Sequence, residues 1–223
     1  MRLMSFFATF GAASLAAAGM VLAPAAAVAA EKRIEATGFT GVTLQGKMDV
    51  VIEQGRETQV IARGSDQALA DLEVDVEKSV LRLKQKRGAR TGEGEDRVTI
   101  SIRMPTLESF ALAGTGNVSL NQIRAATLEL KIAGAGDIKA TGGCHTLNIS
   151  LAGSGDVDAK DFKCETVSVK IAGSGDVSAY ASKDFSARIA GSGDIDVCGN
   201  PENRSRSVFG SGEINYISAK SKK

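Results

Sequence analysis

The stretch that decides the fold is Ile171-Ala-Gly-Ser-Gly-Asp-Val177, because near-copies of it fill the second half of the chain. Six copies begin at Leu112, Ile132, Leu151, Ile171, Ile189 and Val208. Their first glycines are 20, 19, 20, 18 and 19 residues apart and are Gly114, Gly134, Gly153, Gly173, Gly191 and Gly210. A period of about 19 residues is too short for a propeller blade or a helical-pair repeat.

Apolar and polar residues alternate on both sides of these glycines, which is the pattern of β-strands. One unit of strand, tight corner and strand cannot bury its apolar side chains, whereas stacked units can. We therefore predict an all-β, right-handed parallel β-solenoid with degenerate N-terminal coils. Two interior columns follow from the spacing. They are Leu112, Ile132, Leu151, Ile171, Ile189 and Val208, and Val118, Ile138, Val157, Val177, Ile195 and Ile214.

The corner glycines have a steric explanation. A tight corner needs either a positive φ or a close approach between coils, and glycine permits both. In the last coil Arg204 and Arg206 stand where earlier coils have apolar residues, and Phe209 stands where they have alanine. These changes predict a terminal cap.

The first half carries the same phrase in degenerate form at residues 42–52. Further strands are predicted at residues 58–62, 72–77, 80–84 and 97–104, and a helical turn is predicted at residues 66–72, with Ser65 or Asp66 as its cap. Residues 86–96 are Gly-rich and charged, as in a mobile surface loop. No linker separates the halves, so we expect one domain over residues 31–219, followed by a frayed basic tail at 220–223.

Residues 1–30 have the pattern of a secretory signal peptide. Arg2 precedes an apolar run over residues 3–22, and the small-residue exit contains Ala27-Val28-Ala29. The alternative is an uncleaved membrane anchor. After cleavage we expect no membrane span, and a location in the periplasm, on the outer surface or in the medium.

Composition excludes several classes of protein. The 27 Lys and Arg nearly balance the 26 Asp and Glu, which argues against a nucleic-acid surface. Aromatic residues make up only 4% of the 223 residues, so a base-stacking platform is not expected. The 25 glycines occur with only three prolines, which excludes collagen.

The segment Gly38-Phe-Thr-Gly-Val-Thr-Leu-Gln-Gly46 and the repeated Ile-Ala-Gly-Ser-Gly-Asp phrase resemble the bacterial auto-transporter adhesin head GIN domain family. The resemblance covers residues 38–216. It implies a secreted or envelope β-solenoid with an adhesive or structural role, and it carries no catalytic residues to transfer.

An acidic row follows the corners at Asp137, Asp156, Asp176 and Asp194. Either corner amides and hydroxyls satisfy these carboxylates, or Ca²⁺ bridges them. The nine-residue Ca²⁺ solenoid repeat supplies more oxygens per turn, which favours the first explanation. With the neighbouring serines they form a candidate binding strip for sugars or a partner protein, made of Ser154, Asp156, Ser174, Asp176, Ser192 and Asp194.

Cys144 and Cys164 each lie nine residues before a first glycine, so they share a phase on adjacent coils. Equivalent residues lie about 4.8 Å apart there, which suits a disulfide in an oxidising compartment. The alternative is a pair of stacked free thiols. Cys198 has another phase and is expected to stay unpaired.

His145 beside Cys144 raises the possibility of a metal pair or a catalytic dyad, yet the pattern supplies no third group. We expect an exposed wall histidine. The repeated corners are not phosphate-binding loops, and no nucleophile elbow or dinucleotide fingerprint is present.

These observations predict a non-enzymatic protein for adhesion, surface binding or scaffolding, with no cofactor and no metal. An envelope protein or a glycan surface is the expected partner, and the polar last coil predicts a monomer or weak oligomer. The alternatives are a polysaccharide lyase or hydrolase and, less favoured, an envelope-stress accessory protein that senses a membrane partner.

Overall fold

The computed structural model describes residues 30–86 and 97–217. The predicted signal sequence up to residue 29, nearly all of the predicted loop at 86–96 and the predicted basic tail lie outside the described residues.

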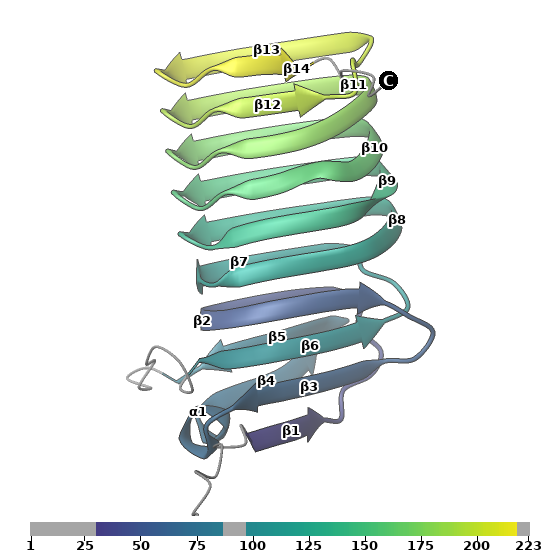
Figure 1. The fold of residues 1–223 in the computed structure, drawn as a ribbon, viewed down its shortest axis with the longest axis vertical. Coiled ribbons are helices and arrows are strands. Elements are labelled where there is room, and N and C mark those ends of the chain that lie inside the picture. Colours follow the sequence, from purple (N-terminus) through teal and green to yellow (C-terminus); the bar gives the residue numbers. More distant parts are fainter. Residues whose placement is uncertain (1–29, 87–96, 218–223) are drawn as a thin grey trace, which may run out of the picture.

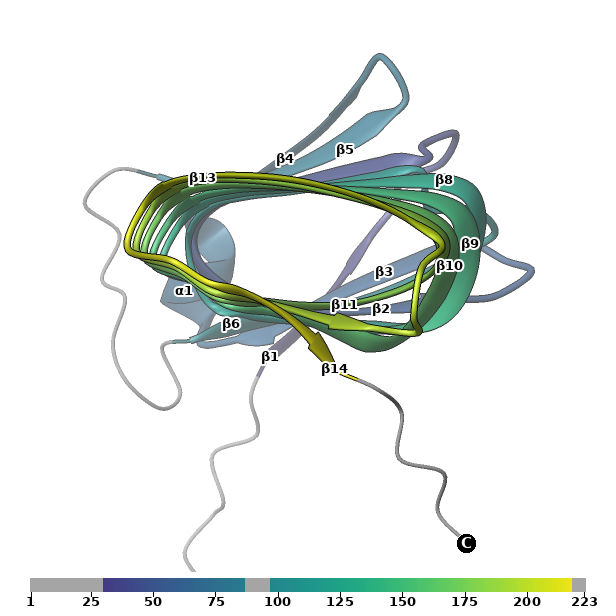
Figure 2. The same cartoon turned by 90° about the horizontal axis from the view of Figure 1, so that it is seen from above.

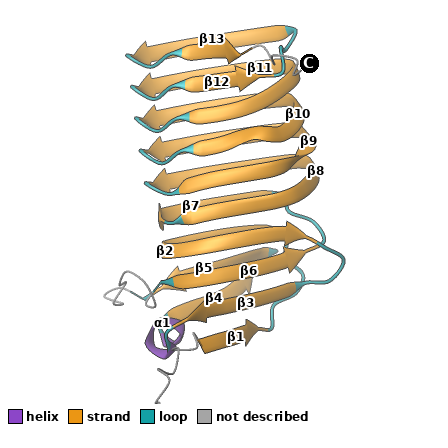
Figure 3. Cartoon of the chain, viewed as in Figure 1, coloured by secondary structure: helices purple, strands orange, loops and turns teal. Residues whose placement is uncertain are grey.

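A single sheet of 14 strands makes up the described part of the chain, with one short helix at its N-terminal end (Figures 1 and 3). The helix is α1 (Asp66–Ala70). The strands are β1 (Ala30–Ile34), β2 (Gly41–Gln54), β3 (Gln59–Gly64), β4 (Leu72–Glu77), β5 (Val80–Gln85), β6 (Val98–Met104), β7 (Ser109–Thr115), β8 (Asn117–Gly134), β9 (Asp137–Gly153), β10 (Val157–Gly173), β11 (Val177–Gly191), β12 (Ile195–Cys198), β13 (Asn203–Gly210) and β14 (Ile214–Ile217).

From β7 onwards every strand pairs in parallel with its neighbours, one coil above the other. In Figure 2 the chain winds counterclockwise as it rises toward the viewer, so the solenoid is right-handed. Each coil turns sharply at its glycine pair and bends more gradually at the opposite end, where β8, β9 and β10 continue around the bend (Figure 2). The predicted β-solenoid is confirmed.

The register aligns the repeated phrases as predicted. Ile171 pairs with Leu151 on one side and with Ile189 on the other, and Val177 lies between Val157 and Ile195. Both predicted columns face the interior, and only Val208 in the last coil is partly open, at 38% exposure. No polar or charged side chain is buried among the described residues. The ionisable chemistry of the described chain therefore lies on the outer walls.

The corner glycines have the conformation and the crowding that the sequence predicts. Gly153 has a φ of +137°, and a Cβ atom there would overlap the carbonyl oxygen of Gly134 on the preceding coil. Each coil thus closes against the backbone of the coil before it, and the repeat needs glycine at this point.

The first half departs from simple stacking. β2 continues the solenoid and pairs in parallel with β5, β6, β7 and β8. β3 pairs antiparallel with both β6 and β1, while β4 forms an antiparallel hairpin with β5. β2 keeps the geometry of a degenerate coil, and β5 and β6 stack in parallel beneath it. The antiparallel strands β1, β3 and β4 form an N-terminal cap together with α1 (Figure 1). Period-two alternation marks a strand but carries no information on its direction, so this difference was not visible in the sequence.

The predicted helical turn is α1, shorter by two residues than expected. The Ser65 hydroxyl accepts a 3.3 Å hydrogen bond from the backbone N–H of Ala68, and Asp66 lies in the first turn. Ser65 is therefore the N-cap, as this residue type often is.

The last coil closes with polar groups, as predicted. The Arg204 guanidinium lies 4.3 Å from the centre of the Tyr216 ring, and its nitrogens donate to the carbonyl of Pro201 and the side chain of Asn200. Phe209 is 68% exposed because no coil covers it. Within residues 30–86 and 97–217, no helix has the length and apolar character needed to span a bilayer.

Candidate functional site

Polar side chains gather at both ends of the flattened coil. The corner strip, defined as Ser154, Asp156, Ser174, Asp176, Ser192 and Asp194, follows the tight glycine corners. The rounded end, defined as residues 121–127, 141–146, 161–166 and 181–184, lies on the opposite side (Figure 2). The sequence singled out the first surface and, of the second, only Cys144, His145 and Cys164.

The aspartates of the corner strip are bonded to the backbone of the next coil. Asp137 Oδ1 accepts from the N–H of Asp156 at 3.1 Å, and Asp156 Oδ1 accepts from Asp176 at 2.9 Å. The ladder continues through Asp194 to Glu213, and Asp49 makes the same bond to Asn117. One oxygen of each carboxylate is thus committed to holding two coils together, as is common for aspartate in turns.

The serines of the corner strip hold the corners through their backbones. The N–H groups of Ser154, Ser174 and Ser192 each donate to a glycine carbonyl one coil earlier, at 2.9 to 3.0 Å, and their side chains face solvent. Among the residues that the structure describes, no three or more His, Cys, Asp or Glu side chains converge in a way that could hold a metal ion. Ca²⁺ takes six to eight oxygen ligands, more than one aspartate per coil supplies.

Cys144 and Cys164 are paired residues on β9 and β10, with Cα atoms 4.6 Å apart, and their sulfur atoms form a disulfide. Cys198 lies in a different column, next to Tyr180, and is a free thiol. Burial raises the pKa of the Cys198 thiol, and the nearby carboxylate of Asp196 raises it further.

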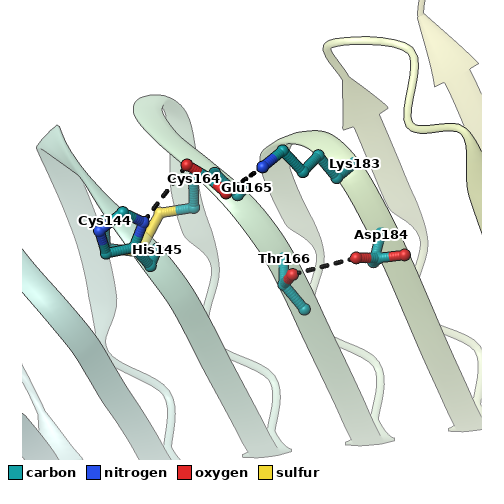
Figure 4. A network of polar contacts seen from close by, with 7 residues as sticks. All are labelled: Cys144, His145, Cys164, Glu165, Thr166, Lys183 and Asp184. Atoms are coloured by element: carbon teal, nitrogen blue, oxygen red, sulfur yellow. Dashed lines mark hydrogen bonds and ion pairs between the residues drawn. A yellow bond between two sulfur atoms is a disulfide. The ribbon is translucent and has the colours of Figure 1, made fainter.

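His145 begins a row of charged side chains beside this disulfide (Figure 4). Its Nδ1 lies 3.3 Å from Glu165 Oε1, and Lys183 Nζ donates to Glu165 Oε2 at 2.6 Å. The hydrogen bond from Lys183 lowers the pKa of the Glu165 carboxyl, and the same bond raises the pKa of Lys183. The sulfur of Cys144 is bonded to Cys164, so the residues here do not form a Cys–His dyad.

A groove of about 1100 Å³ lies at the rounded end, and it was not among the predicted sites. Its walls are Gln122, residues 124–127 and 141–145, and Lys163, together with Thr106 and Glu108 from the segment before β7. The groove lies where the regular stacking of the rounded ends starts. β2 ends at Gln54, and the chain then forms α1 and β3 to β6 before it reaches β7 at Ser109, so no strand continues from β2 around the rounded end beneath β8.

The side chain of Gln54 replaces part of the missing coil. Its Oε1 accepts from the N–H of Arg124 at 2.6 Å, and its Nε2 donates to the carbonyls of Arg124 and Pro105 at 3.2 and 2.7 Å. One side-chain amide thus makes the bonds that a neighbouring strand would make. It fixes the backbone of Arg124 at the wall of the groove.

Local backbone irregularity widens the same region. The pairing of β8 with β9 shifts register between Leu120 and Ile123, where Gln122 has a φ of +55°. The N–H of Gln122 is bonded to the Thr141 hydroxyl at 3.1 Å, which holds this bulge. Bulges re-aim side chains in this way next to many functional sites.

Comparison with known proteins gives a family and a fold. The family described as "Putative auto-transporter adhesin, head GIN domain" matches residues 38–201, which include the groove-lining segments of β8, β9 and β10. No curated protein matches the chain.

Solved structures share the architecture at low sequence identity. A protein from Bacteroides fragilis NCTC 9343, described as a putative adhesin, matches with a TM-score of 0.70 and 20% identity over 86% of this chain and 98% of its own. A second protein with that description, from Parabacteroides distasonis ATCC 8503, matches with a TM-score of 0.52 and 17% identity over 85% of this chain and 97% of its own. At these identities the similarity shows the fold alone.

Proposed function

The chain belongs to the family described as "Putative auto-transporter adhesin, head GIN domain", and from this premise we propose that it is a non-enzymatic surface-binding protein of the cell envelope. Its ligand is a glycan or a protein on an envelope surface. Residues 1–30 are its cleaved export signal, and one solenoid domain over residues 31–219 performs the binding. The two similar structures are described as putative adhesins, which supports a role outside the cytoplasm.

The groove at the rounded end is the observation that carries this proposal. Elsewhere the solenoid wall repeats one pattern from coil to coil, and a repeated flat surface offers little selectivity. The groove breaks the repeat and gathers hydroxyl, amide and charged side chains in one hollow. Convergent polar groups in a concave site are what ligand binding requires.

Catalysis by the same groove is the less favoured alternative. Glycoside hydrolysis uses two carboxyl groups that flank the scissile bond. Glu108 is the one carboxylate among the groove-lining residues of the described chain. The nearby Glu165 is already engaged by Lys183 and His145. These observations favour binding over hydrolysis.

Binding to isolated envelopes tests the proposal. The labelled chain, with its disulfide formed, is incubated with envelope fractions, and the bound fraction is measured against unlabelled competitor. Saturable, competed binding is expected, with no release of reducing sugar or unsaturated product from polysaccharides. Binding that does not saturate, or product formation at a catalytic rate, contradicts the proposal.

Two sets of variants separate the candidate surfaces. Arg124→Gln with Lys163→Gln alters the groove, whereas Asp156→Asn, Asp176→Asn and Asp194→Asn remove the charge of the corner strip and keep a hydrogen-bond acceptor. If the groove variant loses binding and the corner-strip variant keeps it, the groove is the attachment surface. The reverse result assigns attachment to the corner strip.

A further inference from the structure

Two cations and a glycine form one column across the groove. Gly143 on β9 pairs with Arg124 on β8 and with Lys163 on β10, so the three residues lie on successive coils. Adjacent parallel strands are about 4.8 Å apart, so the Cα atoms of Arg124 and Lys163 are separated by about 10 Å. The residue between them has no side chain, which leaves a notch with a cation on either side.

Neither cation has an anionic partner among the described residues. The side chains of Arg124 and Lys163 are exposed and line the groove, and no ion pair within residues 30–86 and 97–217 includes them. Lys160 and Lys183, by contrast, are paired within the protein, with Asp158 and Glu165 respectively. The two groove cations are therefore available to an external anion.

The notch is held open and held rigid. A Cβ atom at position 143 would lie 2.7 Å from the carbonyl oxygen of Lys163, so a larger residue there requires the backbone to shift. Cys144 and Cys164 directly follow Gly143 and Lys163, and their disulfide fixes the spacing of the two coils. A fixed spacing between binding groups lowers the entropic cost of holding a ligand.

The rest of the lining indicates the kind of anion. Thr106, Thr127 and Gln122 supply hydroxyl and amide groups, and Ala125 and Ala126 contribute only short side chains. Glu108 and His145 also line the groove, so it carries one carboxylate beside the two cations. Among the described residues, no Phe, Tyr, Trp, Leu, Ile, Val or Met side chain lines the groove. Peptide interfaces depend on such side chains as anchors, whereas a charged, hydroxyl-rich ligand can be held by hydrogen bonds. The cations supply charge-assisted hydrogen bonds to carboxylate or sulfate.

We propose that this groove binds an acidic saccharide, with one carboxylate or sulfate group held between Arg124 and Lys163 over Gly143. The proposal rests on the surface-binding function above and names the ligand class of that site. The sugar hydroxyls face the threonine and glutamine side chains, and the chain of sugars runs along the groove.

Calorimetric titration with defined hexamers tests the ligand class. The probes are hexagalacturonate, a sulfated glucose hexamer, the neutral glucose hexamer and a hexaglutamate peptide, each added to the purified oxidised chain at low and high salt. We expect binding of at least one acidic hexamer that weakens with salt, and at least tenfold weaker binding of the neutral hexamer. The acidic hexamer that binds more tightly shows whether the site prefers a carboxylate or a sulfate group.

Variants of the same chain test the position. Arg124→Gln or Lys163→Gln is expected to weaken the acidic hexamer about fivefold, and the double variant about twentyfold, since each exposed charge-assisted contact is worth little more than 1 kcal/mol. The control is Lys170→Gln with Arg188→Gln, which removes the same two charges from adjacent, exposed positions on another wall. It is expected to change the affinity less than twofold. Thermal unfolding of each variant confirms that it is folded.

Three outcomes overturn the proposal. The first is failure of every acidic hexamer to bind, and the second is equal weakening in the groove and control variants. The third is binding of hexaglutamate as tight as that of the sugars, which would make the ligand an acidic peptide. If envelope binding persists in Arg124→Gln/Lys163→Gln, the acidic saccharide site is wrong while the surface-binding function stands. If the unaltered chain does not bind envelopes, the function itself fails.

Discussion

Asp176 reaches across to the next coil, where its Oδ1 accepts a 2.7 Å hydrogen bond from the backbone N–H of Asp194. The same bond recurs at the other corners, so each acidic side chain satisfies an amide of the coil that follows it. The acidic row is therefore part of the framework of the solenoid, because each carboxylate accepts a hydrogen bond from the backbone of the adjacent coil.

The first prediction concerns this ladder. Asp176→Ala should lower the free energy of unfolding by about 1 kcal/mol, because the N–H of Asp194 loses its acceptor in an exposed corner where water can replace it. Asp176→Asn keeps an acceptor oxygen and should cost less than half as much. Urea unfolding of the three proteins gives the comparison, and equal losses in both variants would show that charge, not the hydrogen bond, matters here.

The second prediction concerns the corner glycine. Gly153→Ala should lower the free energy of unfolding by about 3 kcal/mol or more, because φ is +137° and the new methyl group meets the carbonyl oxygen of Gly134. Ser154→Ala, at the adjacent exposed position, is the matched control and should change it by about 0.5 kcal/mol or less. A stable Gly153→Ala protein would mean that the coils can separate at this corner.

The repeated part of the fold was predictable because each residue faces the same surroundings in every coil. Ile171 and Gly173 repeat at the same phase, so one physical explanation covers all their equivalents. The antiparallel β1, β3 and β4 were not predictable, because alternation is the same for either strand direction. The repeat of about 19 residues is also too degenerate to be recognised in this part of the sequence.

The groove was not predictable for a related reason. It depends on β2 ending at Gln54 and β7 beginning only at Ser109, with no strand between them around the rounded end beneath β8, and on a bulge at Gln122, where φ is +55°. The contact of Gln54 with Arg124 spans 70 positions and has no local pattern. The one usable signal was the position of each residue within its repeat. Arg124, Gly143 and Lys163 each lie 10 residues before the first glycine of a repeat, at 134, 153 and 173. The argument that aligned the two cysteines would therefore have aligned these three residues as well.

The third prediction concerns the disulfide. Cys144→Ser with Cys164→Ser should lower the free energy of unfolding by about 3 kcal/mol, as estimated from the entropy of closing a loop of this length. The separation of the two cysteines is 20 residues. Cys198→Ser is the control and should have a much smaller effect, because Cys198 is a free thiol. Urea unfolding with and without reductant measures both. Reductant should destabilise the unaltered chain and leave the double variant unchanged.

The fourth prediction concerns pH and the ion pair of Glu165 with Lys183. The pKa of Glu165 is lowered from 4.5 chiefly by the hydrogen bond from Lys183, and His145 contributes less. A carboxyl whose pKa is lower in the folded state stabilises the fold above its unfolded pKa, and this stabilisation is lost as the pH falls through the folded pKa. The effect therefore belongs to the acid side, below pH 4.5.

Lys183→Met tests this assignment, because it removes the ammonium and keeps a side chain of similar length. The carboxyl resonance of Glu165, followed by NMR from pH 2 to pH 7, should titrate at a higher pH in the variant than in the unaltered chain. His145→Gln should move it in the same direction by a smaller amount, since the Nδ1 contact is longer, at 3.3 Å against 2.6 Å. A larger shift in His145→Gln than in Lys183→Met would contradict the order of the two contacts and would make His145 the main partner of Glu165.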